Sequence, residues 1–282
     1  MIKKTILFAV VLQITLSVAA QDLNVMSFNI RYNNPGDSLN AWPHRIVKVT
    51  SQILFHEADY VGLQEALAGQ LQDLQNGLPD YKVIGVGRDD GKTKGEYSAI
   101  IYNSKRLKAL ESATFWLSQT PDIIGSRGWD AALPRIVTWA KFKDLKTKKT
   151  FFAFNTHFDH IGKEARRESA HLLLKKVKEI AGKNRAFITG DFNAEPNAEP
   201  VQIIVNPSDP DQLTDSRQLS QMPHYGPTGT FNAFQRKEVD DNPIDYIFLK
   251  GSWKVKKHAA LSQTWGGRFA SDHFALFAVL GY

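Results

Sequence analysis

Short apolar runs alternate along the chain with amphipathic stretches and polar breaks. Runs rich in Val, Ile, Phe and Tyr are typical of buried strands. They predict strands at residues 22–30, 58–63, 81–86, 97–103, 107–117, 135–142, 151–156, 186–189, 244–249, 253–261 and 274–280. Apolar residues at helical spacing predict helices at residues 42–56, 67–78, 164–181 and 196–205. The stretch 206–225 is rich in Pro, Asp, Ser and Gln, and we expect it to form a loop.

The helix at 164–181 has the clearest pattern. Ala170, Leu173 and Val177 fall on one face, and Gly182 ends the helix. Strands outnumber helices in the whole pattern, the helices are interspersed among them, and the sequence contains neither an internal repeat nor a low-complexity linker. This order predicts one domain in which packed sheets are flanked by helices.

The amino-terminal segment has the features of a secretory signal peptide. Lys3 and Lys4 supply positive charge, residues 5–18 are apolar, and residues 18–20 read Val-Ala-Ala. We expect cleavage after Ala20, a domain at 21–282, and a secreted or periplasmic protein. A short membrane anchor or a buried helix is the alternative, although the run is short for a bilayer span. Later segments are not apolar for long enough to predict stable membrane insertion.

Composition narrows the chemistry. The chain contains no cysteine, which excludes disulfides, Cys-ligated zinc and thiol catalysis. Its formal net charge is +6, and loss of Lys3 and Lys4 would leave 33 basic and 29 acidic residues. Such a mild positive excess favours anionic ligands weakly, and it falls short of the dense basic surface of a dedicated DNA-binding protein.

Polar side chains recur where predicted strands begin or end. On its own, each has an ordinary explanation as a turn residue or a helix-start charge. Together they provide many oxygen ligands and two histidines without zinc-site spacing, which suits Mg²⁺ or Mn²⁺ and phosphoester hydrolysis. They are Asn29, Glu65, His157, Asp191, Asn193, Asp245, Asp272 and His273.

These residues lie in motifs that resemble the endonuclease/exonuclease/phosphatase superfamily, whose members share the pancreatic-deoxyribonuclease-like fold. The motifs span most of the chain in the family's order: Met26 to Arg31, Gly62 to Glu65, Asn155 to Phe158, Gly190 to Asn193, Ile244 to Ile247 and Ser271 to His273. The resemblance implies an α+β, four-layer α/β/β/α sandwich, with two mixed, mainly antiparallel sheets packed face to face and helices outside them.

The resemblance also implies roles for the metal and water groups. Glu65 would bind the metal, with Asn29 beside it as a ligand or a supporting group. Asp272 is a further candidate ligand. Asp191 would orient or deprotonate the attacking water, and Asn193 would hydrogen-bond a phosphoryl oxygen.

Both histidines are implied to act on phosphate. His273 would contact the scissile phosphate, with Asp272 fixing its tautomer and favouring its charged form. His157 would be a second phosphate-contacting group. Asp245 would support this network or ligate metal.

Residues 115–135 concentrate aromatic and Arg residues, and they resemble the deadenylase and nocturnin-like branch and its bacterial relatives. Arg127 and Arg135 are candidate phosphate clamps, and Trp116 or Trp129 a candidate stacking group. The alternative is core packing for the Trp residues and ordinary ion pairs for the Arg residues.

Two further segments are candidates for substrate contact. Arg166 or Arg167 could reach phosphate from the start of the predicted helix, or they form a solvated face. The Gly-containing stretch 226–234 is a candidate substrate lip, with Phe231 or Phe234 as a stacking group, or it is a plain connection.

Four functions remain open from the sequence. The favoured one is a secreted, Mg²⁺- or Mn²⁺-dependent, monomeric hydrolase of a small phosphorylated molecule or nucleotide. The alternatives are a nuclease on DNA or RNA, a phosphodiesterase of lipid headgroups, and a catalytically silent binding module. The binding module is disfavoured because binding alone has no chemical need for five polar groups of this kind. The five are Glu65, Asp191, Asn193, Asp245 and His273.

Overall fold

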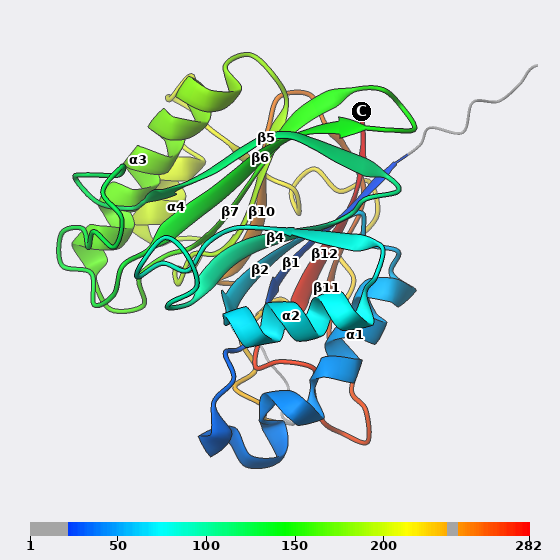
Figure 1. The fold of residues 1–282 in the computed structure, drawn as a ribbon. Helices are drawn as coiled ribbons and strands as arrows, with labels where there is room; N and C mark the ends of the chain where they lie inside the picture. Colours follow the sequence, from blue (N-terminus) through cyan, green and yellow to red (C-terminus); the bar gives the residue numbers. More distant parts are fainter. Residues whose placement is uncertain (1–21, 236–241) are drawn as a thin grey trace, which may run out of the picture.

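The structure is a computed structural model that describes residues 22–235 and 242–282. The predicted signal peptide at 1–20 lies outside the described residues. The remaining chain forms two six-stranded sheets, ordered β11-β12-β1-β2-β4-β3 and β5-β6-β7-β8-β10-β9 (Figure 1). Among the named strands only β1–β2 and β7–β8 pair in parallel, and the other neighbours are antiparallel.

The strands of the first sheet are β1 (Leu23–Asn29), β2 (Tyr60–Ala66), β3 (Tyr81–Ile84), β4 (Tyr97–Asn103), β11 (Lys254–Leu261) and β12 (Ala275–Gly281). Those of the second are β5 (Leu107–Trp116), β6 (Ile136–Asp144), β7 (Thr150–His157), β8 (Ala186–Asp191), β9 (Thr214–Asp215) and β10 (Asp245–Lys250). The two sheets pack against each other through aromatic side chains that include Tyr60, Phe142, Phe151 and Phe187.

Helices cover the outer face of each sheet, as Figure 1 shows. Helices α1 (Ile46–Phe55) and α2 (Ala68–Gly77) pack on the first sheet, and α3 (Lys163–Ala181) and α4 (Glu199–Ile204) on the second. This arrangement confirms the predicted four-layer sandwich. Within the described residues, none of the helices is long and apolar enough to cross a membrane.

The predicted helix at 42–56 is wrong in its first turn. Two 3₁₀ turns, η1 (Pro35–Asn40) and η2 (Trp42–His44), precede α1, which begins only at Ile46 after Arg45 as its N-cap. Pro43 lacks an amide hydrogen, so it fits the opening of a turn better than the interior of a helix.

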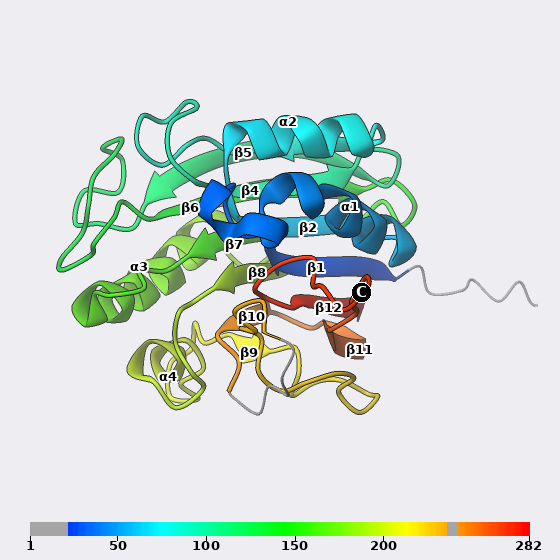
Figure 2. The same cartoon turned by 90° about the horizontal axis from the view of Figure 1, so that it is seen from below.

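The predicted loop at 206–225 is partly sheet. Thr214 and Asp215 form β9 beside β10, and bridges join Ser220 to Val255 and Tyr225 to Ala259 of β11. Figure 2 shows this yellow segment alongside β10 and β11. Its polar composition suits a strand edge that faces solvent, which is why the hydrophobic pattern did not reveal it.

Candidate active site

Sheet topology brings the predicted polar residues to one edge of the sandwich. Parallel β1 and β2 end at Asn29 and near Glu65. Parallel β7 and β8 end with His157 opposite Asp191. Antiparallel β10 begins there, with Asp245 opposite Asp191. Residues far apart in the sequence therefore meet at one end of the sheets.

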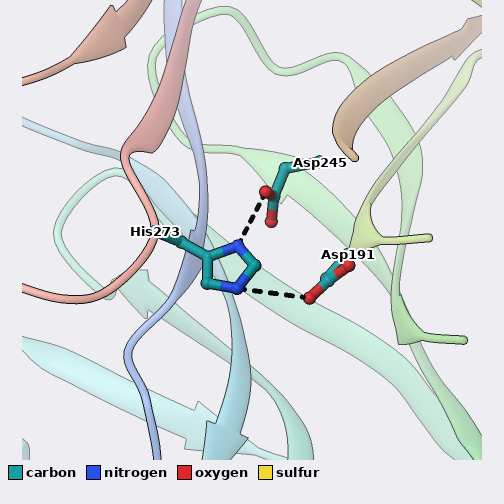
Figure 3. A group of neighbouring side chains, drawn as sticks. All are labelled: Asp191, Asp245 and His273. Atoms are coloured by element: carbon teal, nitrogen blue, oxygen red, sulfur yellow. Dashed lines mark hydrogen bonds and ion pairs between the residues drawn. The ribbon is translucent and has the colours of Figure 1, made fainter. Parts of the chain in front are cut away.

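His273 lies between two carboxylates, and Figure 3 shows the three side chains. Its Nδ1 is 2.9 Å from Asp245 Oδ2, and its Nε2 is 3.8 Å from Asp191 Oδ2. The prediction that Asp272 fixes the tautomer of His273 is wrong, because Asp245 holds Nδ1. Asp272 lies in a bend just before His273, and its carboxylate is directed to Ser271 Oγ at 3.2 Å and towards Arg31 at 3.8 Å.

Burial and charge shift the pKa values of this group in a direction useful for catalysis. Burial would lower the pKa of His273, but the charges of Asp245, Asp191 and Asp272 and the hydrogen bond that His273 donates to Asp245 raise it well above its usual value. Burial and the nearby charge of Asp245 raise the pKa of Asp191 to about 7. His273 is therefore a cationic donor beside a carboxylate that is poised to exchange a proton at neutral pH.

A β-bulge aims Glu65 at this edge. The β2–β4 register shifts between Leu63 and Ala66, and Glu65 has a φ of +62°. Its Oε1 accepts from Asn29 Nδ2 at 3.1 Å, and its Oε2 accepts from the amide of Tyr32 at 3.2 Å. A bulge and a positive φ are means of redirecting a side chain at a functional site.

Asn29 supports the carboxylates in this structure. Its Nδ2 donates to Asp191 Oδ2 at 3.0 Å as well as to Glu65, and its Oδ1 accepts from the amide of Arg31 at 3.0 Å. Because that oxygen already has a partner, the geometry favours the supporting role over direct metal ligation.

Asp272 shares a space with Glu65. Arg31 lies 3.8 Å from a carboxylate oxygen of each, too far for a hydrogen bond, and its closer partner is Asp37 at 3.0 Å. Asp272 Oδ1 accepts from Ser271 Oγ at 3.2 Å, so Oδ2 keeps its lone pairs. Each oxygen of Glu65 accepts one hydrogen bond, but a carboxylate oxygen has lone pairs for more than one contact, so these two negative carboxylates together fit a hard divalent cation such as Mg²⁺ or Mn²⁺.

Asp191, Asp245 and His273 form a second group whose possible ligand atoms lie within 4.8 Å of one another. Such a group can hold a metal. However, His273 is cationic here and its Nδ1 is engaged by Asp245, so its protonated Nε2 has no lone pair for a cation. The geometry therefore suits this group to water and phosphate, and it makes the Glu65–Asp272 pair the better candidate for a cation site.

The second histidine is neutral. Burial and the charges of Arg135 and Arg88 hold the pKa of His157 well below its usual value. Asn193 Nδ2 donates to His157 Nε2 at 3.1 Å and to Phe158 O at 3.0 Å, so both amide hydrogens are engaged. The predicted bond from Asn193 to a phosphoryl oxygen would have to replace one of these two.

A pocket of about 540 Å³ opens over these groups. The predicted residues that line it are Glu65, His157, Asp191, Asn193, Asp272, His273 and Arg135, and Phe231 lines it from the predicted lip. Arg127, Trp129 and Arg166 are not among its lining residues. Arg127 is exposed, and Arg166 instead donates to Asp159 O at 2.8 Å.

Sequence reasoning gave no role to several lining residues. Arg31 is the last residue of the Met26 to Arg31 motif and Tyr32 follows it, and the charge of Arg31 beside a predicted strand end was the one available signal. Glu96, 3.9 Å from His157 Nδ1 and held by Arg88 at 2.7 Å, lies just before a strand without any motif. Leu133 looked like an ordinary loop residue.

Comparison with known proteins agrees with this geometry. Residues 26–273 match the model of the Endonuclease/Exonuclease/phosphatase family. A crystal structure of an endonuclease/exonuclease/phosphatase from Bacteroides vulgatus is 44% identical with a TM-score of 0.88, and the match covers 92% of this chain and 98% of that one.

The mannosyl-6-phosphatase of Bacteroides thetaiotaomicron is 39% identical with a TM-score of 0.87, covering 92% of this chain and 100% of that one. The human nocturnin catalytic domain with bound sulfate shares the fold, with a TM-score of 0.71 at 20% identity, over 92% of this chain and 93% of that one. On its sequence, its two-sheet architecture and the motifs at the sheet edge, the chain belongs to the Endonuclease/Exonuclease/phosphatase family, whose members hydrolyse phosphoesters.

Proposed function

We propose that this protein is an exported, divalent-metal-dependent phosphatase that acts on a small phosphorylated sugar. The observation that carries the proposal is the 540 Å³ pocket, which has Glu65, Asp191 and His273 among its lining residues. A volume of this size suits a small molecule rather than a groove for duplex nucleic acid. The similarity to a mannosyl-6-phosphatase supports a sugar phosphate as the substrate class.

The metal would be held by Glu65 and Asp272, with Asn29 keeping Glu65 in place through its 3.1 Å hydrogen bond. When bound there, Mg²⁺ or Mn²⁺ would neutralise phosphate charge and so lower the barrier to attack. Arg31 contributes a fixed positive charge on the same side, since Asp37 holds its guanidinium at 3.0 Å.

Asp191 is the proposed general base. With a pKa near 7, its carboxylate takes a proton from water, and the water oxygen then attacks phosphorus. His273 donates its Nε2–H to a phosphoryl oxygen as negative charge accumulates, and Asp245 keeps that ring cationic. The bond from phosphorus to the sugar oxygen breaks as the new one forms, and that oxygen takes a proton from solvent water so that the sugar leaves as an alcohol.

The test is an assay of the purified chain with Mg²⁺, Mn²⁺ or EDTA on hexose 6-phosphates, p-nitrophenyl phosphate, bis-p-nitrophenyl phosphate, nucleotides, DNA and RNA. We expect metal-dependent release of phosphate from sugar phosphates and its loss in Glu65→Ala. Glu179→Ala on the exposed face of α3 is the matched control and should retain activity. Cleavage of DNA or RNA with sugar phosphates untouched would replace this proposal by the nuclease alternative.

Export is part of the proposal and rests on the sequence of residues 1–20. In a bacterial host, the full chain should accumulate outside the cytoplasm with Gln21 as its first residue. Amino-terminal sequencing of the exported protein measures this directly. Retention of residues 1–20 in a membrane fraction would instead support the anchor alternative.

A further inference from the structure

Arg135, Asp159 and His160 form a fixed cluster in the wall of the pocket. Arg135 Nε donates to Asp159 Oδ2 at 3.3 Å, and its Nη2 lies 3.0 Å from His160 Nδ1. Asp159 also accepts from the amides of Ile161 and Gly162 at 3.0 and 2.8 Å. The side chains of Arg135 and Asp159 are only 4% and 1% exposed, so the cluster is held rigidly.

The cluster carries two unused hydrogen-bond donors. A guanidinium only donates, so His160 Nδ1 must accept from Arg135 and the ring proton must sit on Nε2. Within the described part of the chain, the buried Nη1 of Arg135 has no hydrogen-bond partner. Arg135 and His160 both line the pocket that contains Asp191 and His273. A buried donor without a partner is costly, and a ligand acceptor would remove that cost.

Charge decides which acceptor suits this wall. The charge of Arg135 is compensated by Asp159, whose pKa is about 2: burial would raise that pKa, but hydrogen bonds from Gly162, Ala132 and Ile161 and the charge of Arg135 lower it. The carboxyl of Glu96 lines the same pocket. Glu96 is in turn paired with Arg88 at 2.7 Å, so the two arginines of this wall are matched by two carboxylates. The wall therefore has no excess positive charge for a second phosphate or carboxylate, whereas a neutral hydroxyl can accept from its donors without needing one.

We propose that Arg135 and His160 form a leaving-group subsite that selects hydroxyl-bearing sugars, with His160 Nε2–H and Arg135 Nη1–H donating to hydroxyl oxygens. This inference rests on the proposed function. It adds the residues that distinguish a sugar phosphate from a phosphoester whose leaving group has no hydroxyl substituents. His160 is the specificity-determining position that can be tested directly, because its side chain is exposed and its replacement leaves the buried Arg135–Asp159 pair in place.

The experiment compares His160→Phe, His160→Gln and the wild type on hexose 6-phosphates, their single-deoxy analogues and p-nitrophenyl phosphate. The Phe variant removes the donor, so kcat/KM for the hexose phosphates should fall about tenfold, chiefly through KM. Hydrolysis of p-nitrophenyl phosphate, whose leaving group carries no hydroxyl substituent, should stay within about twofold. The Gln variant keeps a donor and an acceptor, so its kcat/KM for the hexose phosphates should be close to that of the wild type.

The deoxy analogues locate the contact. With the wild type, kcat/KM for one analogue should be about tenfold lower than for the parent hexose phosphate. With the Phe variant, kcat/KM should be the same for that analogue and the parent, because both changes remove the same hydrogen bond. His171→Phe on the exposed surface of α3 is the control and should match the wild type on every substrate. Thermal unfolding of each variant verifies that the fold is intact.

The outcomes separate this inference from the proposed function. If His160→Phe lowers kcat/KM equally for hexose phosphates and p-nitrophenyl phosphate, the subsite is overturned. Sugar phosphatase activity that depends on Glu65 in the wild type would still support the proposed function. A wild type that cleaves p-nitrophenyl phosphate but no sugar phosphate would overturn both the substrate class and the subsite. A wild type with no metal-dependent activity would overturn the proposed function itself.

Discussion

At the residue scale, Asp191 and His273 depend on a shared neighbour. Asp245 raises the pKa of both: its charge opposes ionisation of Asp191, and its charge and hydrogen bond stabilise protonated His273. In the proposed mechanism, one buried carboxylate therefore prepares both the base and the cationic donor. Asp245 Oδ1 has no hydrogen-bond partner among the described residues, so its negative charge is not dispersed by other donors.

We expect Asp245→Asn to change both the rate and the pH profile. Without the carboxylate, the pKa of His273 falls, so the alkaline limb of kcat/KM, where His273 loses its proton, moves to lower pH. The rate itself should fall by about 10²- to 10⁴-fold, as for other positioned acid–base groups. Profiles of kcat/KM against pH for both proteins, with metal in excess, measure the shift.

Asp122→Asn, at an exposed position, is the matched control for that profile. An alkaline limb that is unchanged in Asp245→Asn would mean that His273 does not act as a charged donor.

At this scale, the residues that motifs picked out lie together in one pocket, whereas contacts that depend on a neighbouring side chain were not predicted. Glu65, Asp191 and His273 were all assigned to the site. The partner of His273 was not, because Asp245 and Asp272 are equally acidic in sequence and only the direction of each side chain distinguishes them. Glu96 was missed because its contact with His157 crosses between the two sheets.

At the element scale, the segment 220–226 covers the free edge of β11. Backbone bonds join Gln221 N to Val255 O at 2.8 Å and Ala260 N to Tyr225 O at 2.9 Å. His224 Nδ1 lies 2.9 Å from His258 Nδ1 across this contact. Because the carbonyl of Pro227 takes the Nε2–H of His224, His258 must donate to His224 Nδ1.

This pair predicts an acid-sensitive stability. Burial and the neighbouring His224 and Arg217 lower the pKa of His258 to about 3. Below about pH 6.5 this histidine binds a proton in the unfolded chain but not in the folded chain. As the pH is lowered, the free energy of unfolding therefore decreases by about 1.4 kcal/mol per pH unit, until the pH reaches the pKa of the folded state. His258→Asn keeps a donor but cannot titrate, and should lose less stability between about pH 6.5 and 5.

Urea unfolding of the wild type and the variant at both pH values measures this difference. His171→Phe, an exposed histidine, should show the same pH dependence as the wild type. If the free energy of unfolding changes with pH by the same amount in the wild type and His258→Asn, the histidine pair does not titrate as inferred.

At the scale of the whole molecule, the two sheets approach each other closely at Gly62. A β-carbon there would collide with Thr189 Oγ1 and Asn155 Oδ1 of the opposite sheet. Asn155 Nδ2 donates across the gap to Leu63 O and Ala99 O at 2.8 Å each. This polar contact joins the strands that carry Glu65 to those that carry Asp191, and so fixes the distance between the two halves of the site.

We expect Gly62→Ala to lower the free energy of unfolding by about 1–3 kcal/mol, because the sheets must separate to admit the methyl group. It should also reduce kcat, since the two halves of the site move apart. Gly69→Ala in α2 is the control: a β-carbon there meets nothing within 4 Å, and alanine should stabilise the helix by about 0.5–1 kcal/mol. Equal stability of the two variants would contradict the close approach.

The sequence by itself determined most of the strands, the four-layer class and the acidic and histidine residues of the site. Those features depend on local periodicity and on motifs that are contiguous in the chain. Tertiary structure decided which carboxylate holds His273, that Glu96 approaches His157, and that Arg135 rather than Arg127 or Arg166 lines the pocket. Each of these depends on the register between strands and the packing of one sheet on the other, which a hydrophobic pattern along one chain does not specify.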